Sequence, residues 1–424
     1  MVEAEPQARA ESRASGLAQL DLTDGELYRQ GFPHETFVRL RREAPVWWQA
    51  IPDTLTETQE EGFWVLSRYD DVQTANRDTE RFSALDGPSL SHRPEMRDMM
   101  LVSMDGDRHA RQRKLISAGF TPRMVARLDA QMRRWAASIV DGALARGTCE
   151  FVHDVAYQLP MHMIADIVGI PVEDRRWLFT LTTDFLRAGD PASAVSREQQ
   201  MATQAEMFRY AQELGRWKRA HPQDDIWTIL STVEIEGDDG ERTALSEGEL
   251  DLFFLLLTIA GSETTRNAIS IGLFALLDHP DQLETLRNDP SAMAAAVEEI
   301  LRWSSPVSYF ARRATCDVEV RGVRIAAGDR VTLWYPSANR DEDVFDDPFC
   351  FDIRRQPNEH LAFGGGGPHY CLGANLARRE VGILFEELLA RTRRIELAGP
   401  PTYAALSIYS PILVALQKLP VRMS

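Results

Sequence analysis

The feature that most constrains the fold is one segment, Ser246 to Asp278, which carries a single helical pattern over about 33 residues. Ser246-x-x-Glu249 is a capping-box signature that marks a helix start, and Pro280 lies just beyond the predicted end. At about 1.5 Å per residue such a helix is about 50 Å long. Apolar side chains occupy all its faces through Phe253–Ala260, so the helix must be buried all round. We therefore expect it to pass through the centre of a large domain.

Helical patterns dominate the rest of the chain as well. Nearly every segment from Asp107 to about Leu277 has a helical pattern, and after Trp303 the chain changes to short runs that are typical of strands. We therefore predict a mostly α fold with a minor β region near one end. The predicted helices are His34–Arg42, Thr121–Arg146, His153–Val168, Glu173–Arg187, Arg197–His221, Ala292–Trp303 and Leu372–Arg391, and the predicted strands are Phe63–Leu66, Val318–Ile325, Arg330–Tyr335 and a pair near residues 408–422.

Two segments lack regular patterns. Residues 1–18 consist mainly of Ala, Glu, Arg and Ser with no apolar period, and we predict a disordered arm. Residues 83–100 contain glycine, two prolines and polar residues, which predicts a long loop. Loops of that length inside a compact domain are usually functional.

The charge balance excludes several classes of partner. The 424 residues include 47 Lys+Arg against 64 Asp+Glu, a formal net charge of −17. Phosphate backbones bind clustered cations, so such a polyanion is a poor nucleic-acid binder. The longest apolar run, Leu252 to Gly261, is about half the roughly 20 residues that a membrane span needs, and the N-terminus lacks the apolar core of a signal peptide. A cytoplasmic enzyme without a membrane span is the expectation.

One of the four cysteines stands in a special context. The segment Phe363-Gly-Gly-Gly-Gly-Pro-His-Tyr-Cys371-Leu-Gly373 brings a cysteine to the predicted start of a helix. Glycines let successive backbone N–H groups turn toward one anion, and a helix N-terminus adds partial positive charge. Both effects lower a thiol pKa, so we expect a shielded thiolate. A phosphate loop lacks support because no Gly-Lys-Ser/Thr ending is present, whereas an inert buried cysteine remains an alternative.

Two further segments carry charged groups in places of interest. Within the long apolar helix, Ala260-Gly261-Ser-Glu263-Thr264 sets an acid beside a hydroxyl, where Gly261 can open the helix and the two side chains can relay protons. A simple helix bend explains these residues equally well. Glu299-Ile-Leu-Arg302 places an acid and a base on one helix face, a pattern that most often forms a solvated surface bridge.

Together the three segments resemble, in order and spacing, the cytochrome P-450 superfamily of haem-thiolate monooxygenases, from about Ala44 to the C-terminus. The resemblance implies the fold of that family, with haem b between the long central helix and the cysteine-loop helix, in one domain over residues 19–424. Cys371 then matches the axial haem ligand, whose electron donation favours O–O cleavage. Glu263 and Thr264 match the acid–alcohol pair that delivers protons during oxygen activation.

The resemblance assigns further residues to the cofactor and to its support. Glu299, Arg302 and Arg355 match a buried cluster that anchors the cysteine loop. The residues that match propionate partners are His109, Arg113, Arg312 and His369, and those that match other haem contacts are Phe363, Gly373, Ala260 and Gly261. A solvated helix pair is the alternative for His109 and Arg113.

The cysteine loop departs from the common family pattern by one residue. Counted backward from Cys371, Gly367 and His369 keep their places, so the extra residue lies in the glycine run. The longer loop, with Leu333–Arg340 and Ala374–Arg379, resembles a subgroup of actinobacterial members that hydroxylate methyl-branched lipids and sterol side chains. The implied substrate is therefore a methyl-branched lipid, terpenoid or sterol, and tailoring of a polyketide or other secondary metabolite is the alternative.

The resemblance also implies a substrate pocket and redox partners. The candidate pocket residues are Leu256, Val307, Tyr309 and Phe310, each of which is equally compatible with plain core packing. Electrons are expected from a ferredoxin and a ferredoxin reductase, since no flavin or nicotinamide motif is present. The candidate docking cations are Arg108, Arg111, Lys114, Arg378 and Arg379, for which a solvated basic face is the alternative.

Two rival functions use the same cofactor. A haem-thiolate sensor binds haem and gas without turnover, and it has no use for the Glu263–Thr264 pair. A peroxygenase uses hydrogen peroxide directly, and that branch of the family carries Arg-Pro in place of the acid–alcohol pair. Neither rival fits these residues as well as a monooxygenase.

Overall fold

The long apolar segment forms one helix, α11 (Glu247–Asp278), in the computed structural model. The structure describes every residue except 1–8, 10–16, 18, 53–57, 59, 91–96, 188–195, 224, 237–241 and 407–412. Ser246 caps α11 as predicted, since its Oγ accepts a hydrogen bond from the Glu249 amide at 3.2 Å. The Glu249 carboxylate in turn accepts one from the Ser246 amide at 2.9 Å, which completes the capping box.

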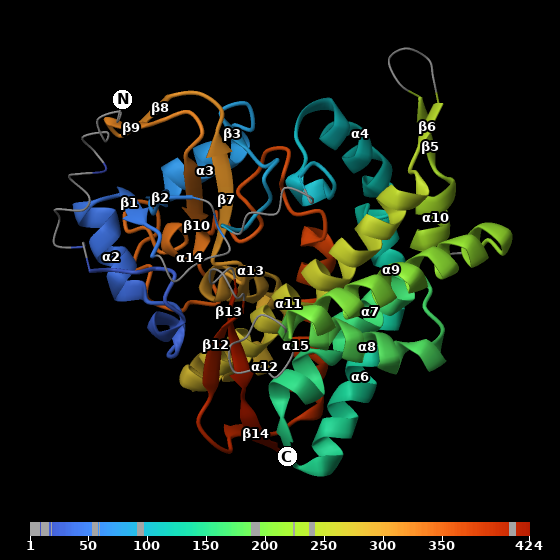
Figure 1. The fold of residues 1–424 in the computed structure, drawn as a ribbon. Helices are drawn as coiled ribbons and strands as arrows, with labels where there is room; N and C mark the ends of the chain where they lie inside the picture. The colour runs from blue at the N-terminus through green and yellow to red at the C-terminus, as the bar shows by residue number, and fades with distance from the viewer. Residues whose placement is uncertain are drawn as a thin grey trace.

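The other helices surround α11 (Figure 1). Their bounds are α2 (His34–Glu43), α3 (Tyr69–Arg77), α4 (Gly106–Ser117), α5 (Pro122–Arg127), α6 (Asp129–Arg146), α7 (Gln158–Val168), α8 (Val172–Arg187), α9 (Arg197–Ala220), α10 (Ile226–Thr232), α12 (Pro280–Asn288), α13 (Met293–Ser304), α14 (Tyr335–Ala338) and α15 (Ala374–Arg391), with short 3-10 helices at Gly25–Tyr28, Leu101–Ser103 and Pro290–Ala292. Helices α7, α9, α13 and α15 all pack against α11. The apolar faces of α11 are therefore covered from several sides, as the sequence predicts.

Two of the predicted helices are interrupted. The segment predicted as Thr121–Arg146 forms α5 and α6, which are separated at Leu128, where the amide donates to the Val125 and Ala126 carbonyls in a tightened turn. The segment predicted as His153–Val168 begins with a π turn before α7. Local tightening or widening of one turn leaves the side-chain period almost unchanged, so the sequence pattern does not reveal it.

The largest sheet lies on the opposite side of α11 from helices α6 to α10 (Figure 1). Its strands run in the order β1-β2-β10-β7-β3, with β10 parallel to β2 and the other neighbours antiparallel. The bounds are β1 (Val46–Ala50), β2 (Gly62–Leu66), β3 (Phe82–Ser83), β7 (Tyr309–Ala314) and β10 (Arg330–Trp334). The sequence did not predict β7, because Arg312 and Arg313 interrupt the apolar pattern of an interior strand.

Four small sheets complete the β region. The bounds are β4 (Thr148–Glu150), β5 (Glu234–Glu236), β6 (Arg242–Ala244), β8 (Val318–Val320), β9 (Val323–Ile325), β11 (Ile395–Leu397), β12 (Thr402–Leu406), β13 (Leu413–Lys418) and β14 (Pro420–Met423). The predicted C-terminal pairing near residues 408–422 is wrong: β13 pairs with β12, whereas β14 pairs with β11 and β4. β14 begins at a proline, Pro420, two residues after the end of β13, and the two strands belong to different sheets.

The predicted disordered arm lies mostly outside the described residues. Two of its residues, Arg9 and Leu17, are described. The guanidinium carbon of Arg9 lies 4.0 Å from the centroid of the Trp48 ring, and the same side chain pairs with Asp329. Leu17 is buried. A cation–π contact and an apolar contact thus tie these two residues to the protein.

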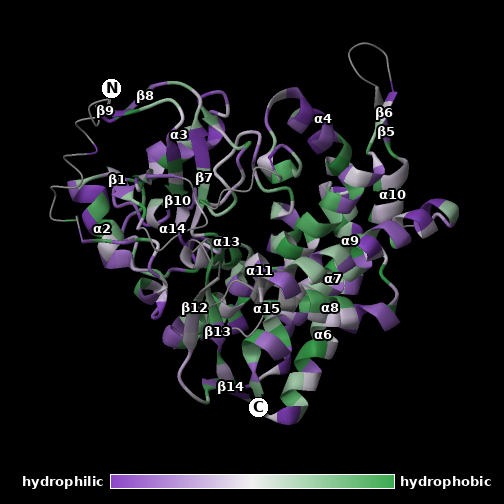
Figure 2. Ribbon diagram, in the orientation of Figure 1, coloured by the Kyte–Doolittle hydropathy of each residue, from purple (hydrophilic) through white to green (hydrophobic). Residues whose placement is uncertain are grey.

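Hydropathy follows the layers of the fold. Figure 2 shows hydrophobic residues gathered where α7 and α11 meet and hydrophilic residues prevailing on α4. Within the described residues, no helix is long and apolar enough to cross a membrane. A large cavity lies in the interior beside α11.

Candidate active site

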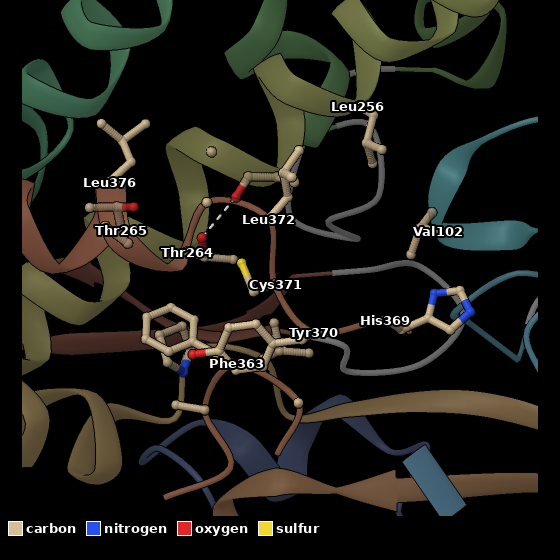
Figure 3. A pocket seen from close by; sticks show the side chains of 18 of the residues that line it. Val102, Leu256, Thr264, Thr265, Phe363, His369, Tyr370, Cys371, Leu372 and Leu376 are labelled. Atoms are coloured by element: carbon tan, nitrogen blue, oxygen red, sulfur yellow. Dashed lines mark hydrogen bonds between the residues drawn. The ribbon is translucent and has the colours of Figure 1, made fainter. Parts of the chain in front are cut away.

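The glycine-rich loop presents the Cys371 thiol to this cavity. Gly364–Gly367 all have positive φ, from 66° to 102°, a region that residues with a Cβ rarely adopt. The Cys371 amide donates to the Phe363 carbonyl at 3.0 Å and closes the loop, and α15 begins at Ala374. The thiol is exposed to the cavity, and in Figure 3 it points toward the side on which Thr264 lies. The loop thus delivers a cysteine to the start of a helix.

The protonation of Cys371 differs from the sequence prediction. Burial raises the pKa of this thiol above its ordinary value, and the Gly373 amide and the charges of Arg113 and Arg378 oppose that rise without cancelling it. The prediction of a lowered pKa is therefore wrong for the chain by itself, because desolvation outweighs the favourable charges. A coordinated metal ion deprotonates a thiol outright, so this sulfur suits metal ligation better than nucleophilic catalysis.

The four predicted propionate partners line the same cavity. They are His109, Arg113, Arg312 and His369. The ring centroids of His109 and His369 are 4.4 Å apart, and His369 Nε2 lies 3.1 Å from Asp105 Oδ1. His109 is only 3% exposed, so the alternative of a solvated helix pair with Arg113 is wrong. Elements far apart in the sequence therefore bring four basic side chains to one wall.

These basic side chains are short of counter-charge. Burial, followed by the charges of His369 and Arg113, lowers the pKa of His109 to about 4. Burial also lowers the pKa of Arg312 and of Arg113. Among the described residues, His109 Nε2 and Arg312 Nε have no hydrogen-bond partner. Buried cations with unused donors are stabilised by a bound anion that accepts from them.

Helix α11 forms the facing wall. Ala260, Gly261 and Thr264 line the cavity, and Thr264 Oγ1 donates to the Ala260 carbonyl at 2.7 Å (dashed in Figure 3). The helix continues through Gly261, where an added Cβ would lie 3.1 Å from Ile164 Cδ1. The suggestion that Gly261 opens the helix is therefore wrong, and glycine here permits the close approach of α7.

Glu263 does not lie in the cavity wall. Its side chain is buried, at 6% exposure, and it pairs with Arg266 one turn further along α11. The residues that line the cavity include Thr264 and Thr265 but not Glu263. Glu263 and Thr264 are neighbours in the sequence, but their side chains leave α11 in different directions, and of the two only Thr264 lines the cavity.

Sequence reasoning missed a second acid, which does line the cavity. Glu380 of α15 is 2% exposed and lines the wall beside Thr265. Burial raises its pKa to about 8, although a hydrogen bond from Thr265 lowers it in part. A sequence signal was available, because Leu376 and Leu384 lie one turn before and one turn after this acid, so it shares their apolar face.

The three residues predicted to support the cysteine region, Glu299, Arg302 and Arg355, lie together in one cluster. Glu299 and Arg302 are both 0% exposed, and the Glu299 carboxylate accepts from Arg302 Nε at 2.7 Å and Nη2 at 2.8 Å. Arg355 Nε lies 3.3 Å from the same carboxylate, and the Asp352 amide donates to it at 2.9 Å. A solvated bridge is therefore excluded, and the cluster fixes the irregular segment that precedes the cysteine loop.

Three of the four candidate pocket residues line the cavity. Leu256, Val307 and Phe310 do so, whereas Tyr309 does not. Tyr309 packs on Trp334, with ring centroids 4.8 Å apart, in a separate apolar cluster. The physical reason is that neighbouring residues of β7 point to opposite faces of the sheet. Phe363 and Gly373 also line the cavity.

Most of the predicted docking cations already have acidic partners. Arg108 pairs with Asp98, Arg111 with Glu249, Arg378 with Glu298 and Arg379 with Asp129. Lys114 is exposed and has no acidic partner within the described part of the chain. Arg378 also lies with its guanidinium carbon 4.5 Å from the Phe363 ring centroid, so it belongs to the cysteine loop.

The cavity matches the chemical demands of the haem that the resemblance implies. Haem needs an axial ligand, apolar walls and partners for two propionates. Cys371 could serve as the ligand and the four basic side chains as the partners, two of which carry buried nitrogen atoms without a hydrogen-bond partner among the described residues. The other lining residues are mostly apolar. The residues present therefore fit the group.

Comparisons with known proteins agree with this geometry. The family model "Cytochrome P450" matches residues 194–396. Curated relatives from Mycobacterium tuberculosis include "Putative cytochrome P450 126", 42% identical over 91% of this chain and 94% of the relative, and "Methyl-branched lipid omega-hydroxylase", 40% identical over 92% and 90%. "Steroid C26-monooxygenase" of Rhodococcus jostii is 37% identical over 90% and 80%.

A solved structure shows the same fold. Mycobacterium marinum cytochrome P450 CYP268A2 in complex with pseudoionone superposes with a TM-score of 0.85 at 33% identity, over 99% of this chain and 100% of that one. Membership of the family implies a haem cofactor, a redox partner and a hydrophobic substrate. The fold, the cysteine loop and these matches together lead to one conclusion: the chain belongs to the cytochrome P450 family and is a monooxygenase, an oxidoreductase that incorporates one oxygen atom.

Proposed function

We propose that this monooxygenase binds haem b through Cys371 and hydroxylates an unactivated C–H bond of a methyl-branched lipid, terpenoid or sterol. Dioxygen and two electrons from a ferredoxin, itself reduced by a ferredoxin reductase, are the co-substrates. One observation carries the proposal: an exposed thiol and four buried basic side chains share a cavity whose remaining wall is mostly apolar.

The chain's own residues divide the work of holding the cofactor. Cys371 would ligate the iron, the guanidinium groups of Arg113 and Arg312 would neutralise the propionates, and His109 and His369 would donate hydrogen bonds to them. Haem with a thiolate ligand supplies the redox chemistry that activates dioxygen. The protein adds a dry cavity in which a few fixed dipoles act strongly.

Proton supply is the second task of the chain. Thr264 Oγ1 lies in the wall facing Cys371 and holds its own proton against the Ala260 carbonyl. Glu263 reaches this hydroxyl only after it leaves Arg266. Glu380 is protonated at neutral pH because its pKa is about 8, and it keeps that proton beside Thr265. We infer that these oxygen atoms deliver protons to the reaction centre.

The charge of the wall supports a hydrophobic, uncharged reacting part of the substrate. Apart from the four propionate partners, the described lining contains one residue of a type that carries charge, Glu380. Its raised pKa keeps the side chain neutral. Leu256, Val307 and Phe310 contribute apolar surface. The relatives' names, a methyl-branched lipid hydroxylase and a steroid monooxygenase, support the same class.

The redox partner approaches from the cysteine side in this proposal. Lys114 offers an exposed charge there without an acidic partner among the described residues. Arg108 and Arg379 are held by partly exposed ion pairs, which are worth little in water and exchange readily. An acidic ferredoxin would mainly gain association rate from these cations.

The test begins with the reduced, carbon-monoxide-bound absorption spectrum of the purified protein. Wild type is expected to show the red-shifted Soret band of thiolate-ligated haem, and Cys371→Ser is expected to lose it while folding normally by circular dichroism. A methyl-branched fatty acid, pseudoionone and cholesterol are then titrated against the ferric form. An unshifted band in well-folded wild type, or a normal band in Cys371→Ser, contradicts the assignment.

A further inference from the structure

A buried amide, Asn76, lies between the propionate wall and the glycine loop. It belongs to the last turn of α3 and is 1% exposed. Its Oδ1 accepts from Arg312 Nη2 at 3.1 Å and from the Tyr335 hydroxyl at 3.1 Å. Its Nδ2 donates to the Gly364 carbonyl and, at 3.3 Å, to the Gly366 carbonyl. No residue of α3 lines the cavity in the described chain.

The orientation of this amide is dictated by its four partners. The oxygen faces two donors and the nitrogen faces two carbonyls, so every lone pair and N–H of the side chain is used. A flipped amide would set its NH2 against the Arg312 guanidinium and its oxygen against the carbonyls. The guanidinium polarises the amide, which strengthens its N–H groups as donors to the loop.

The Arg312 side of the contact has little other support. Arg312 is 1% exposed, and its other hydrogen-bond acceptor among the described residues is the Ala311 carbonyl, at 3.0 Å. Within the described residues it forms no ion pair, and its Nε has no partner. Among the described residues, Asn76 is therefore the side chain that accepts a hydrogen bond from this cavity-lining cation.

The loop side depends on the end of α3. Three successive carbonyls, those of Gly364, Gly365 and Gly366, accept from Asn76 or from Arg77, whose Nε donates to Gly365 at 2.8 Å. An added Cβ at Gly364 would lie 3.1 Å from Asn76 Nδ2. The glycine loop is thus held closely by the end of α3.

We propose that Asn76 is a positioning residue that couples Arg312 to the glycine loop, so that the group bound by Arg312 also stabilises the position of Cys371. The inference rests on haem as the occupant of the cavity. Asn76 touches neither the cavity nor the sulfur, so it acts through the loop and through the arginine.

Asn76→Asp isolates the loop side of this coupling. The carboxylate has the same shape and still accepts from Arg312 and Tyr335, but it has no N–H for Gly364 and Gly366. Asn267→Asp is the matched control, since Asn267 is also 1% exposed and donates to a backbone carbonyl, that of Val414, at 2.9 Å. The readouts are hydrogen exchange of the peptide 363–371 and the fraction of red-shifted band in the carbon-monoxide spectrum of the haem-loaded proteins.

In Asn76→Asp, exchange of peptide 363–371 is expected to be at least about tenfold faster, because the loss of even one net hydrogen bond has about that effect and this variant loses two. The fraction of thiolate-ligated protein is expected to fall in the same variant. Asn267→Asp is expected to change neither readout, although it lowers thermal stability. Wild-type values of exchange and spectrum in Asn76→Asp overturn the proposal and leave Asn76 a structural residue.

A measurement on wild type decides the matter if Asn76→Asp does not fold. Haem loading is expected to slow exchange in peptide 69–77 of α3, which does not line the cavity, whereas unchanged exchange there overturns the coupling. Failure of wild type to bind haem at all would end the proposed function. Normal thiolate-ligated haem with an uncoupled Asn76 would end only this inference.

Discussion

Glu380 makes the stability of this protein depend on pH in an unusual direction. Most paired carboxylates stabilise a folded protein as the pH rises, because they ionise more easily when folded. Glu380 does the opposite, since burial raises its pKa from 4.5 to about 8. Folded protein keeps the proton over this range and unfolded protein loses it, so rising pH favours unfolding. The stabilising contribution is complete below about pH 4.5 and is lost by about pH 8.

The size of the effect follows from the shift in pKa. Each pH unit between the two pKa values changes the free energy of unfolding by about 1.4 kcal/mol. The full shift corresponds to about 5 kcal/mol, and the part between about pH 5 and about pH 7.5 to about 3 kcal/mol. Glu380→Gln stays neutral and keeps the shape of the side chain, so the free energy of unfolding of wild type relative to this variant should fall by that amount.

Urea unfolding of wild type and Glu380→Gln at a series of pH values measures this difference directly. Glu319→Gln is the control, because Glu319 is exposed on β8 and has similar surroundings before and after unfolding. Its difference from wild type should be flat across the series. Parallel stability curves for wild type and Glu380→Gln would refute the reasoning, and they would also remove Glu380 as a store of protons at neutral pH.

Three further substitutions test other parts of the site. Glu299→Gln leaves the buried Arg302 guanidinium without its charge partner and should lower the free energy of unfolding by about 3–5 kcal/mol. Asp129→Asn breaks a partly exposed ion pair with Arg379 and should lower it by under about 1 kcal/mol. Equal urea midpoints for the two variants would contradict this contrast. Thr264→Ala should lower the product formed per electron pair by about tenfold or more, measured as product against electrons supplied through the ferredoxin. Unchanged coupling would exclude the role of its hydroxyl. Phe310→Ala should weaken binding of a hydrophobic ligand by about tenfold in spectral titration, while Tyr309→Phe should leave binding unchanged. A larger loss of binding in Tyr309→Phe than in Phe310→Ala would contradict the assignment of the two faces of β7.

Local signals predicted the parts of the fold that depend on local physics. The capping box and the all-round apolar pattern identified α11, and the glycine run identified the turn that carries Cys371. The i,i+3 pair of Glu299 and Arg302 was visible too, although only the structure shows that both side chains are fully buried. Patterns of this kind survive because the residues that specify them are neighbours in the sequence.

The remaining parts depend on contacts between distant segments. β7 was missed because its two arginines look like surface residues, whereas Arg312 is buried against the cavity by strands on both sides. Tyr309 was assigned to the wrong face for the same reason, since the face of a strand cannot be chosen before the strand is recognised. Of two acids, Glu263 was chosen and Glu380 overlooked, because nearness to Thr264 in sequence is not nearness to the cavity.

The contact between α3 and the glycine loop also imposes an order on the making of the protein. The Gly364 carbonyl, to which Asn76 donates, lies 288 residues further along the chain. Asn76 therefore leaves the ribosome long before the loop that it contacts. Four successive glycines in positive φ have little tendency to adopt this turn without outside contacts. During synthesis the Asn76 amide therefore cannot form these two hydrogen bonds until the glycine loop has left the ribosome, and the thiol reaches its place only after this late segment has folded back onto α3.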